Sequence, residues 1–459
     1  MALHRITLDL MLLWPLACLA LTGLVLAYAA FFYGGVVPEN WNVCLLAIGC
    51  ISALYWTFSR KRDRASRLEP WLLWPAILLP CYLAFELIPL PLSVLKTLSP
   101  ARAELLQALQ PLFADAHSAP LSVMPPAALA QFFRIIAYIA VFLLIRELTW
   151  RFLRMRWAIA VPLLVVGTLE AALGMIQCAA DWGNATAHGT YVDRDHFAGL
   201  LEMLLPFALM YGMAILRRGN ARYSSPAWPA ALACLLFAIA ALFLVGIIYS
   251  LSRMGFLVAL SSLFAMAALT VGPALASARL RWLSLGVIAL LVILIFVFLP
   301  PDQLIARFAE LASTDKVSGD TRLHFWRETL PLIAAYPLFG CGLGGFESAF
   351  RRFQTTETLF SVDFAHNDYL QFLAELGVIG FTMLAVFLGG IVWKTASAAW
   401  KEQDVDSRYL AIACAGSLIA ILLHSIVDFN LQIPANAMVF SWVCGLSAGL
   451  YFKARPVRS

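Results

Sequence analysis

Charged side chains are scarce in this chain of 459 residues. Asp, Glu, Lys and Arg make up only 13% of it, whereas hydrophobic residues make up 62%. A soluble globular domain carries about 25% charged residues, so the composition excludes an ordinary soluble protein. A mean hydropathy of +0.83 and repeated apolar runs of about 18 residues or more indicate a polytopic membrane protein instead.

The sequence also lacks the common motifs for binding nucleotides and metals. It has no Walker motif, and its nine cysteines stand mostly within apolar runs without metal-ligand spacing. We therefore expect no metal and no cofactor, and neither ATP nor a sugar nucleotide as substrate. Membrane lipids are expected partners, and nucleic acid is not.

Apolar runs predict an all-α polytopic membrane protein with about 12 transmembrane helices, forming a single integral membrane domain over residues 1–459. The first run, Leu8 to Tyr33, is too long for the core of a signal peptide and is interpreted as a retained span. The run from Pro229 to Thr270 would be about 60 Å long as one helix, twice the hydrocarbon thickness, so it must fold back at Arg253. The predicted spans are 9–32, 41–58, 70–90, 131–147, 157–178, 198–216, 229–249, 254–273, 283–300, 371–393, 409–427 and 435–452.

The basic residues predict the orientation of these spans. About two thirds of the 32 Lys and Arg residues fall in connections on the same side as the N-terminus. Cytoplasmic connections are enriched in Lys and Arg, so both termini are predicted to be cytoplasmic.

Two connections on the outer side are long. Residues 91–130 are rich in proline and are interpreted as a segment lying at the membrane interface. Residues 301–371 form a larger loop that carries most of the polar residues. Within it, a helix is expected to begin near Ser318–Asp320 and to end at Tyr336, and a second, short helix is expected over Phe346–Gln354.

Two arginines stand in short outer connections, where the charge bias of membrane proteins does not favour them. Arg194 and Arg253 are each the only basic residue of their connection. A guanidinium group binds phosphate through two parallel hydrogen bonds, so these positions indicate an anion site. The alternative is that they reach to the membrane surface or pair locally, and Asp193 and Asp195 flank Arg194.

The larger loop adds further candidates. Arg322 and Trp326 are four residues apart, so a helix places a cation and an indole on one face. Arg351 and Arg352 offer possible support for the same site. The run Gly342–Gly345 follows no strand, and a loop between two helices explains it better than a phosphate-binding turn.

Histidines provide a candidate base. His366 stands at the start of a predicted span, and a neutral histidine can accept a proton from a hydroxyl near pH 7. Asp368 either supports His366 or caps the following helix. His424, near the end of another span, is either a hydrogen-bonding residue of the bundle, which we favour, or a second site residue. Cations and a histidine on the outer side suggest a lipid pyrophosphate as substrate, since arginine can stabilise its leaving group.

Several short motifs occur in a fixed order along the second half of the chain. They are Gly189-Thr190-Tyr191-Val192-Asp193-Arg194, Ser250-Leu251-Ser252-Arg253, Arg322-x-x-x-Trp326, Pro337-Leu338-Phe339-Gly340-Cys341-Gly342-Leu343-Gly344-Gly345-Phe346, His366-Asn367-Asp368-Tyr369-Leu370 and His424-Ser425-x-x-Asp428-Phe429. In this order and spacing the region of about 185–445 resembles the bacterial O-antigen ligase / O-antigen polymerase superfamily.

The resemblance implies a metal-independent, inverting glycosyltransferase of the bacterial inner membrane with a periplasmic active site. Such an enzyme moves a glycan from undecaprenyl pyrophosphate to an acceptor hydroxyl. By resemblance, Arg194 and Arg253 would bind the pyrophosphate, Arg322 would assist, and His366 would be the general base. The pair Asp195-His196 departs from the family pattern and leaves open how far Arg194 is neutralised.

The acceptor is not determined by these motifs. We favour a ligase that transfers the glycan to lipid A-core, with an O-antigen or exopolysaccharide polymerase as the close alternative. A protein O-oligosaccharyltransferase is a further alternative. A transporter of lipid-linked glycans would require ionisable residues near the bilayer midplane and inverted repeats, whereas the centres of the predicted spans are nearly free of charge.

Overall fold

The structure is a computed structural model. It describes residues 2–59, 69–109, 111, 117–152, 155–180, 186–218, 227–275, 277–298, 302–306, 320–355 and 361–450. Parts of the predicted outer loop, residues 301, 307–319 and 356–360, therefore lie outside the described residues.

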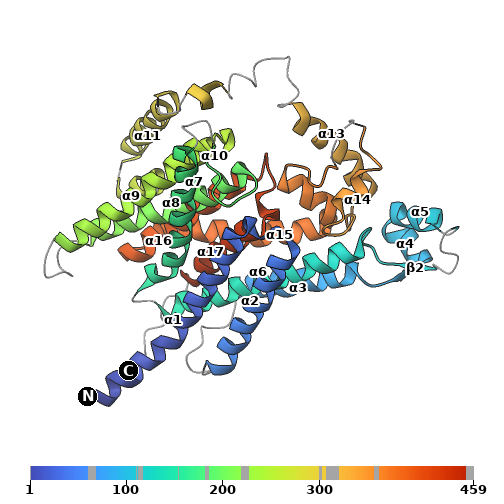
Figure 1. Cartoon of the computed structure of the whole chain (residues 1–459), viewed down its shortest axis with the longest axis horizontal. Helices are drawn as coiled ribbons and strands as arrows, with labels where there is room; N and C mark the ends of the chain where they lie inside the picture. The colour runs from blue at the N-terminus through green and yellow to red at the C-terminus, as the bar shows by residue number, and fades with distance from the viewer. Residues whose placement is uncertain are drawn as a thin grey trace.

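The chain folds almost entirely into helices (Figure 1), and each of the twelve predicted spans overlaps one helix, although several predicted ends differ from those of the helix and residues 299–300 and 451–452 lie outside the described residues. These helices are α1 (Ala2–Phe31), α2 (Pro38–Phe58), α3 (Pro70–Glu86), α6 (Pro125–Arg151), α7 (Val161–Ala180), α8 (Arg194–Arg217), α9 (Ala227–Tyr249), α10 (Arg253–Val271), α11 (Ala278–Phe298), α15 (Asp368–Lys401), α16 (Val405–His424) and α17 (Pro434–Leu450). Among the described residues, nine helices are long and apolar enough to cross a membrane, and α3 is a shorter apolar helix. The protein is thus an all-α polytopic membrane protein, as predicted.

Helix α8 is the most deeply buried of the candidate spans and packs against α9, α10 and α16. Small residues let neighbouring helices approach closely, as is typical of membrane proteins. Gly199 on α8 lies directly against Asn430, and Gly255 on α10 lies directly against Ala198 on α8. These contacts bring the beginnings of α8 and α10 together with the connection that follows α16.

Polar side-chain contacts join several connections at the end of the bundle opposite to the beginnings of α8 and α10. Arg218 Nε donates to Asp406 Oδ1 at 2.6 Å, and Arg408 Nη2 donates to the carbonyl oxygen of Thr270 at 3.0 Å. Lys394 pairs with Glu69. The sequence predicts that the connections holding these residues lie on the same side of the membrane as the N-terminus. The contacts agree with this, because they bring the residues together at one end of the bundle.

The end of the bundle where α8, α10 and α15 begin is here called the site end, and two short strands lie beyond α3 and before α6. Strands β1 (Leu90–Pro91) and β2 (Ser118–Ala119) pair antiparallel, with Leu90 opposite Ala119. Helices α4 (Leu92–Leu98) and α5 (Pro100–Leu109) lie between these strands in sequence. Short 3-10 turns complete the chain at Tyr33–Gly35, Arg156–Ala160, Gly272–Ala274 and, as η6, at Asn430–Gln432.

In the described part of the predicted outer loop, residues 302–306 are helical, and the helices α13 and α14 follow the residues that are not described. Helix α13 (Asp320–Ala335) agrees with the prediction, apart from the proposed start at Ser318, which lies outside the described residues. The prediction of a helix over Phe346–Gln354 is too long, because α14 covers only Phe346–Phe350. The chain turns there, since the N–H groups of Phe353 and Gln354 both donate to the carbonyl oxygen of Phe350.

Helix α15 is broken at Gly377, whose φ of 61° and ψ of −175° are not helical. The glycine-rich loop, residues 337–345, forms hydrogen bonds with the backbone exposed at this break. Cys341 N donates to Ala374 O at 2.9 Å, and Val378 N donates to Pro337 O at 2.9 Å. The loop therefore has a structural role and is called the clasp on α15, in agreement with its interpretation as a loop between two helices. Within it, Gly340 approaches the α15 backbone too closely for any side chain.

Candidate functional site

His366 lies immediately before α15 at the site end. Its backbone has a φ of 50°, in the left-handed region that is rare for residues other than glycine. Its side chain is 31% exposed, and Nδ1 lies 3.6 Å from Asp428 Oδ1. The ring lies between two aromatic side chains, with its centroid 6.3 Å from Phe325 and 4.8 Å from Phe429. Backbone strain of this kind is concentrated at functional sites.

Two side chains of α13 fix the segments that carry His366 and Asp428. Trp326 Nε1 donates to the carbonyl oxygen of His366 at 3.3 Å. Arg322 Nη1 donates to the carbonyl oxygen of Val427 at 2.7 Å. The predicted common face of Arg322 and Trp326 is confirmed, and in this structure both residues hold the backbone of the site.

Asp428 is the centre of the cluster. Its carboxylate is 1% exposed and faces three imidazole rings. Oδ1 lies 3.6 Å from His366 Nδ1 and 3.9 Å from His196 Nε2, and Oδ2 lies 3.9 Å from His424 Nε2. Burial by itself raises the pKa of this carboxyl, but the contact with His366 and the charges of His196, His424 and Arg322 outweigh burial, so the pKa lies well below its usual range.

Asp428 and His196 were not among the predicted site residues. The sequence does contain one signal for Asp428, because His424 and Asp428 are four residues apart at the end of a helix, where side chains at that spacing can meet. His196 carries no comparable signal, since its contact with Asp428 depends on how α8 and α16 pack.

His424 makes a buried contact within the bundle and also faces Asp428. Its Nδ1 lies 2.8 Å from Glu202 Oε1, and the two side chains are 1% and 0% exposed. A buried ionisable side chain in a membrane bundle requires such a partner. Glu202 on α8 was also missed by sequence reasoning, and its contact ties α16 to α8 beneath Asp428.

Asp368 does not cap α15. The cap is Asn367, whose Oδ1 accepts from Tyr369 N at 3.0 Å and Leu370 N at 3.1 Å. The Asp368 side chain is 1% exposed and accepts from Ser425 Oγ at 2.7 Å and Leu431 N at 3.1 Å. It therefore anchors the connection that carries Asp428 to the start of α15.

Arg194 and Arg253 are the first residues of α8 and α10, and both are partly buried. The N-cap of α8 is Asp193, whose Oδ1 accepts from Asp195 N at 2.8 Å, and the N-cap of α10 is Ser252. Asp195 Oδ2 lies 3.4 Å from Arg322 Nη2. Asp195 thus pairs with Arg322. The sequence left open how far Asp195 neutralises Arg194, and this contact shows that the Asp195 carboxylate also faces a second arginine.

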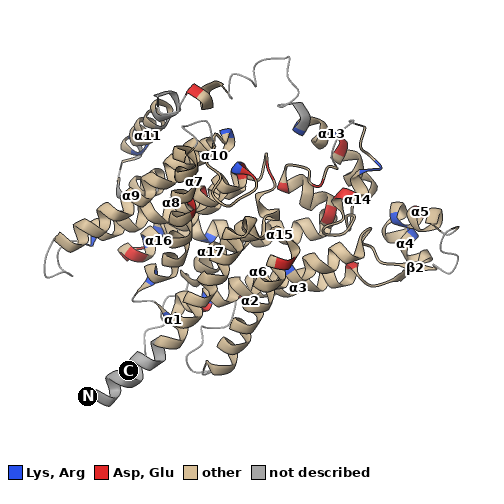
Figure 2. Cartoon of the chain, viewed as in Figure 1, with Lys and Arg blue, Asp and Glu red and all other residues tan. Residues whose placement is uncertain are grey.

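Three helices begin at this end of the bundle close to the cluster. They are α8, α10 and α15, whose first residues are Arg194, Arg253 and Asp368. The N-terminus of a helix carries a partial positive charge and N–H groups that can bind an anion. Figure 2 shows how sparse charged residues are along the helices, so three helix N-termini at one end, two of them beginning with an arginine, are a distinctive feature of this bundle.

Arg351 and Arg352 lie on the exposed surface beside α14. Arg351 Nη2 donates to Glu347 Oε1 at 2.6 Å, and Arg352 Nη2 lies 3.6 Å from Glu104 Oε2 on α5. Both arginines therefore contact carboxylates of other surface residues. Exposed pairs of this kind contribute little to stability, and any supporting role in the site remains a prediction.

In the part of the chain that the structure describes, no group of three or more His, Cys, Asp or Glu side chains is arranged to hold a metal ion. The residues at the site instead supply a base, a buried carboxylate, arginines and helix N-termini. Such a set can accept a proton and stabilise negative charge on an oxygen.

Fold and site together describe a polytopic membrane protein with a polar cluster of carboxylates, imidazoles and arginines at one end of its helix bundle. Residues 237–385 match the family model described as O-Antigen ligase. This match supports the resemblance of the region to the O-antigen ligase/polymerase superfamily. The matched region contains Arg253, Arg322 and His366, whereas Arg194 and Asp428 lie outside it. A comparison with curated proteins gives no match.

Proposed function

We propose that this protein is an O-antigen ligase-like glycosyltransferase that transfers a glycan from undecaprenyl pyrophosphate to a hydroxyl of lipid A-core. The observation that carries the proposal is the His366–Asp428 contact beside three helix N-termini and three arginines. In this proposal the site end faces the periplasm of a bacterial inner membrane, and both chain termini are cytoplasmic.

His366 is the general base in this mechanism. With its Nδ1–H directed at the Asp428 carboxylate, Nε2 carries the lone pair that accepts the proton of the acceptor hydroxyl. Asp428 is a positioning residue, because it holds the ring and stabilises the imidazolium that forms.

The acceptor oxygen then attacks the anomeric carbon of the donor glycan. The new glycosidic bond forms as the bond from that carbon to the pyrophosphate oxygen breaks, so the configuration at the carbon inverts. Undecaprenyl pyrophosphate leaves with the bonding electron pair. Arg194, Arg253 and the N-termini of α8 and α10 would stabilise its charge, and Arg322 would assist while holding Val427.

A polymerase of the same superfamily is the close alternative, because it uses the same donor chemistry and differs in the acceptor. A protein O-oligosaccharyltransferase differs in the same way. A transporter is less well supported. Glu170, which lies near the centre of α7, accepts hydrogen bonds from Thr190 N at 3.0 Å and Thr190 Oγ1 at 2.6 Å and so has a structural role.

The test is a strain that lacks the chromosomal copy, analysed by a lipopolysaccharide gel. Loss of all polymer on lipid A-core, with long lipid-linked polymer accumulating, is the result expected for a ligase. Core carrying a single repeat would identify a polymerase instead. An unchanged gel together with loss of glycan from a secreted protein would identify a protein transferase.

A further inference from the structure

The backbone around His366 is held from both sides. On the C-terminal side, Trp326 Nε1 donates to the carbonyl oxygen of His366 at 3.3 Å. On the N-terminal side, the N–H of Ala365 donates to Gln371 Oε1 at 2.8 Å. The residue between these two bonds has the left-handed φ of 50°. A side chain other than glycine keeps such a conformation only where its surroundings impose it, so these hydrogen bonds help to fix the position of the imidazole.

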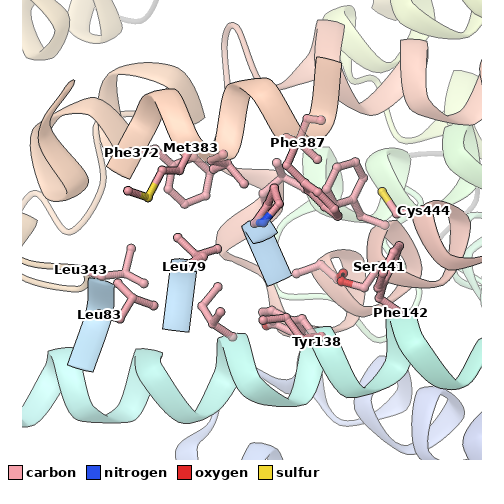
Figure 3. A pocket seen from close by; sticks show the side chains of 18 of the residues that line it. Leu79, Leu83, Tyr138, Phe142, Leu343, Phe372, Met383, Phe387, Ser441 and Cys444 are labelled. Atoms are coloured by element: carbon pink, nitrogen blue, oxygen red, sulfur yellow. Dashed lines mark hydrogen bonds between the residues drawn. The ribbon is translucent and has the colours of Figure 1, made fainter. Parts of the chain in front are cut away.

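Gln371 reaches Ala365 because of its place in α15. It lies at the end of the first turn of the helix, where its own N–H donates to the carbonyl oxygen of Asn367 at 2.9 Å. Helical side chains lean toward the N-terminus of their helix, so the Gln371 amide points back to the connection before α15. The next residue, Phe372, lines the apolar pocket between α3, α6 and α15 (Figure 3). Gln371 is 1% exposed and faces the connection that carries His366 instead.

Glu375 binds the other end of the Gln371 amide. Gln371 Nε2 donates to Glu375 Oε1 at 2.9 Å, a contact that a spacing of four residues on one helix allows. Glu375 is 2% exposed, and its Oε1 also accepts from Phe346 N at 3.3 Å. The N–H of Gly342 in the clasp donates to the carbonyl oxygen of Glu375 at 3.0 Å. Glu375 is therefore fixed through its side chain and through its backbone.

The carboxylate of Glu375 determines which way the Gln371 amide faces. A glutamine side chain has a donor end and an acceptor end, whereas a carboxylate only accepts hydrogen bonds. Glu375 therefore takes the Nε2 end of the amide and leaves Oε1 for the N–H of Ala365. An ionisable side chain within a membrane bundle is costly and commonly marks a functional site. Here the buried carboxylate acts on the segment that carries His366.

We propose that Gln371 is a positioning residue for the base His366 and that Glu375 orients Gln371, an inference that rests on the proposed function. Hydrogen bonds run without interruption from Phe346, the residue after the clasp, through Glu375 and Gln371 to Ala365. The clasp and the base are thus parts of one connected arrangement.

Three contacts together locate the base. Asp428 faces the ring of His366, Trp326 holds its carbonyl oxygen, and Gln371 holds the backbone before it. A general base must lie within hydrogen-bond reach of the hydroxyl whose proton it accepts. A displacement of about 1 Å can cost about 10²-fold in rate, so loss of the Gln371 contact should slow the chemical step.

A leucine at this position tests the role in turnover, because it has a similar size and no polar atoms. Gln371→Leu is assayed as full-length protein in lipid nanodiscs with purified lipid-linked donor and acceptor. We expect kcat to fall about 10- to 100-fold and the KM for the donor to change less than about twofold, since the base is displaced while donor binding is kept. Equal kcat for the variant and the wild type would refute the proposal.

Thr395→Val is the matched control. Thr395 is 1% exposed near the other end of α15, and its hydroxyl donates to the carbonyl oxygen of Ile391 at 2.7 Å. The variant removes a buried hydrogen bond from the same helix, and kcat should stay within about twofold of wild type. A fall in kcat as large as that of Gln371→Leu would show that the effect is not specific to the segment before His366, and would overturn the positioning role.

An exchange of the two side chains tests the role of Glu375. In Gln371→Glu a second carboxylate faces Glu375, and kcat should fall about tenfold or more because like charges four residues apart repel. The double variant Gln371→Glu/Glu375→Gln again places an amide beside a carboxylate and keeps an acceptor for the N–H of Ala365. Its kcat should recover to within about threefold of wild type. Equal kcat for the single and the double variant would show that Glu375 does not orient Gln371.

Hydrogen exchange measured by mass spectrometry separates this inference from the proposed function, since it needs no turnover. The amide of Ala365, a fully buried residue, should exchange at least about tenfold faster in Gln371→Leu than in wild type. Wild-type protein that transfers no glycan would refute the proposed function, while the exchange rates would still decide whether Gln371 orders the backbone before His366. An active wild type whose Gln371→Leu variant shows unchanged exchange at Ala365 would refute the positioning role alone.

Discussion

Asp428 Oδ1 lies 3.6 Å from His366 Nδ1, although the two residues belong to different connections at the site end of the bundle. The contact is possible because Asp368, two residues after His366, accepts hydrogen bonds from Ser425 and Leu431 on either side of Asp428. The two connections are therefore fixed relative to each other, and this relationship is the basis of the predictions about catalysis.

His366→Ala is expected to abolish glycan transfer while the protein still inserts into the membrane. Removal of a general base costs about 10²- to 10⁴-fold in rate. The measurement is surface glycan on a gel, together with the amount of protein in the membrane fraction. His324→Ala is the matched control, because His324 is an exposed histidine on α13, and it should retain wild-type product. Product at wild-type levels from His366→Ala would refute the assigned role.

Arg253→Ala is expected to cause a comparable loss of product without loss of inserted protein. An arginine that stabilises the charge of the leaving group contributes about 10²- to 10³-fold in rate. Arg279→Ala is the control, since Arg279 is an exposed arginine of α11 in a connection predicted to face the cytoplasm. If both variants behave like wild type in a transfer assay with purified donor, Arg253 does not bind the pyrophosphate.

Arg322→Lys should reduce activity although the positive charge is kept. A lysine ammonium cannot reproduce the two directed contacts that Arg322 makes with Val427 O at 2.7 Å and Asp195 Oδ2 at 3.4 Å. We expect kcat/KM to fall about tenfold or more. Arg327→Lys, on the exposed side of the same helix, serves as the comparison and should have little effect. Identical kinetics for the two lysine variants would argue against a directional role of Arg322.

The pH dependence of stability should report on Asp428. Its pKa in the folded protein is lowered, so its ionised form stabilises the fold. This contribution is fully present above about pH 4, the usual pKa of an unfolded aspartate. It is lost as the pH falls from there through the lowered value in the folded protein.

Thermal unfolding of the detergent-solubilised protein measures this effect between pH 6 and pH 2. The wild type should lose more stability over the acidic part of this range than Asp428→Asn, which has no carboxyl to protonate. Asp363→Asn, which removes an exposed carboxyl, should follow the wild-type curve. Parallel curves for wild type and Asp428→Asn would contradict the prediction.

Gly377→Ala should destabilise the protein strongly. The residue has a φ of 61°, and a Cβ there would collide with the backbone of Leu338. Strain and collision together should cost about 2 kcal/mol or more. Gly389→Ala, in the same helix with open space around it, should be neutral or slightly stabilising. Melting temperatures of the two variants in detergent provide the comparison, and equal values would show that the clasp contributes little.

Local features of the site could be predicted from the sequence, because helix periodicity determines them. The shared face of Arg322 and Trp326 follows from their spacing of four residues, and both contact the site in the structure. The twelve apolar runs likewise predict twelve helices, because the hydrophobic pattern of a span is a local property.

Features that depend on packing between distant segments could not be predicted. Asn367 and Asp368 are both suitable N-cap residues, and only the positions of Ser425 and Leu431 show why Asp368 points elsewhere. The three histidines around Asp428 come from three separate segments. Only their spatial arrangement identifies Asp428 as the shared partner.

The break at Gly377 has a consequence for how the protein adapts to its membrane. As a continuous helix, the 34 residues of α15 would be about 51 Å long, well beyond the thickness of a hydrocarbon core. The break divides them into a short first piece, held by hydrogen bonds to the glycine-rich loop, and a longer second piece. A thicker or thinner bilayer can therefore tilt the second piece while the first stays fixed to its loop. We expect His366 to keep its position relative to Trp326 in membranes of different lipid composition.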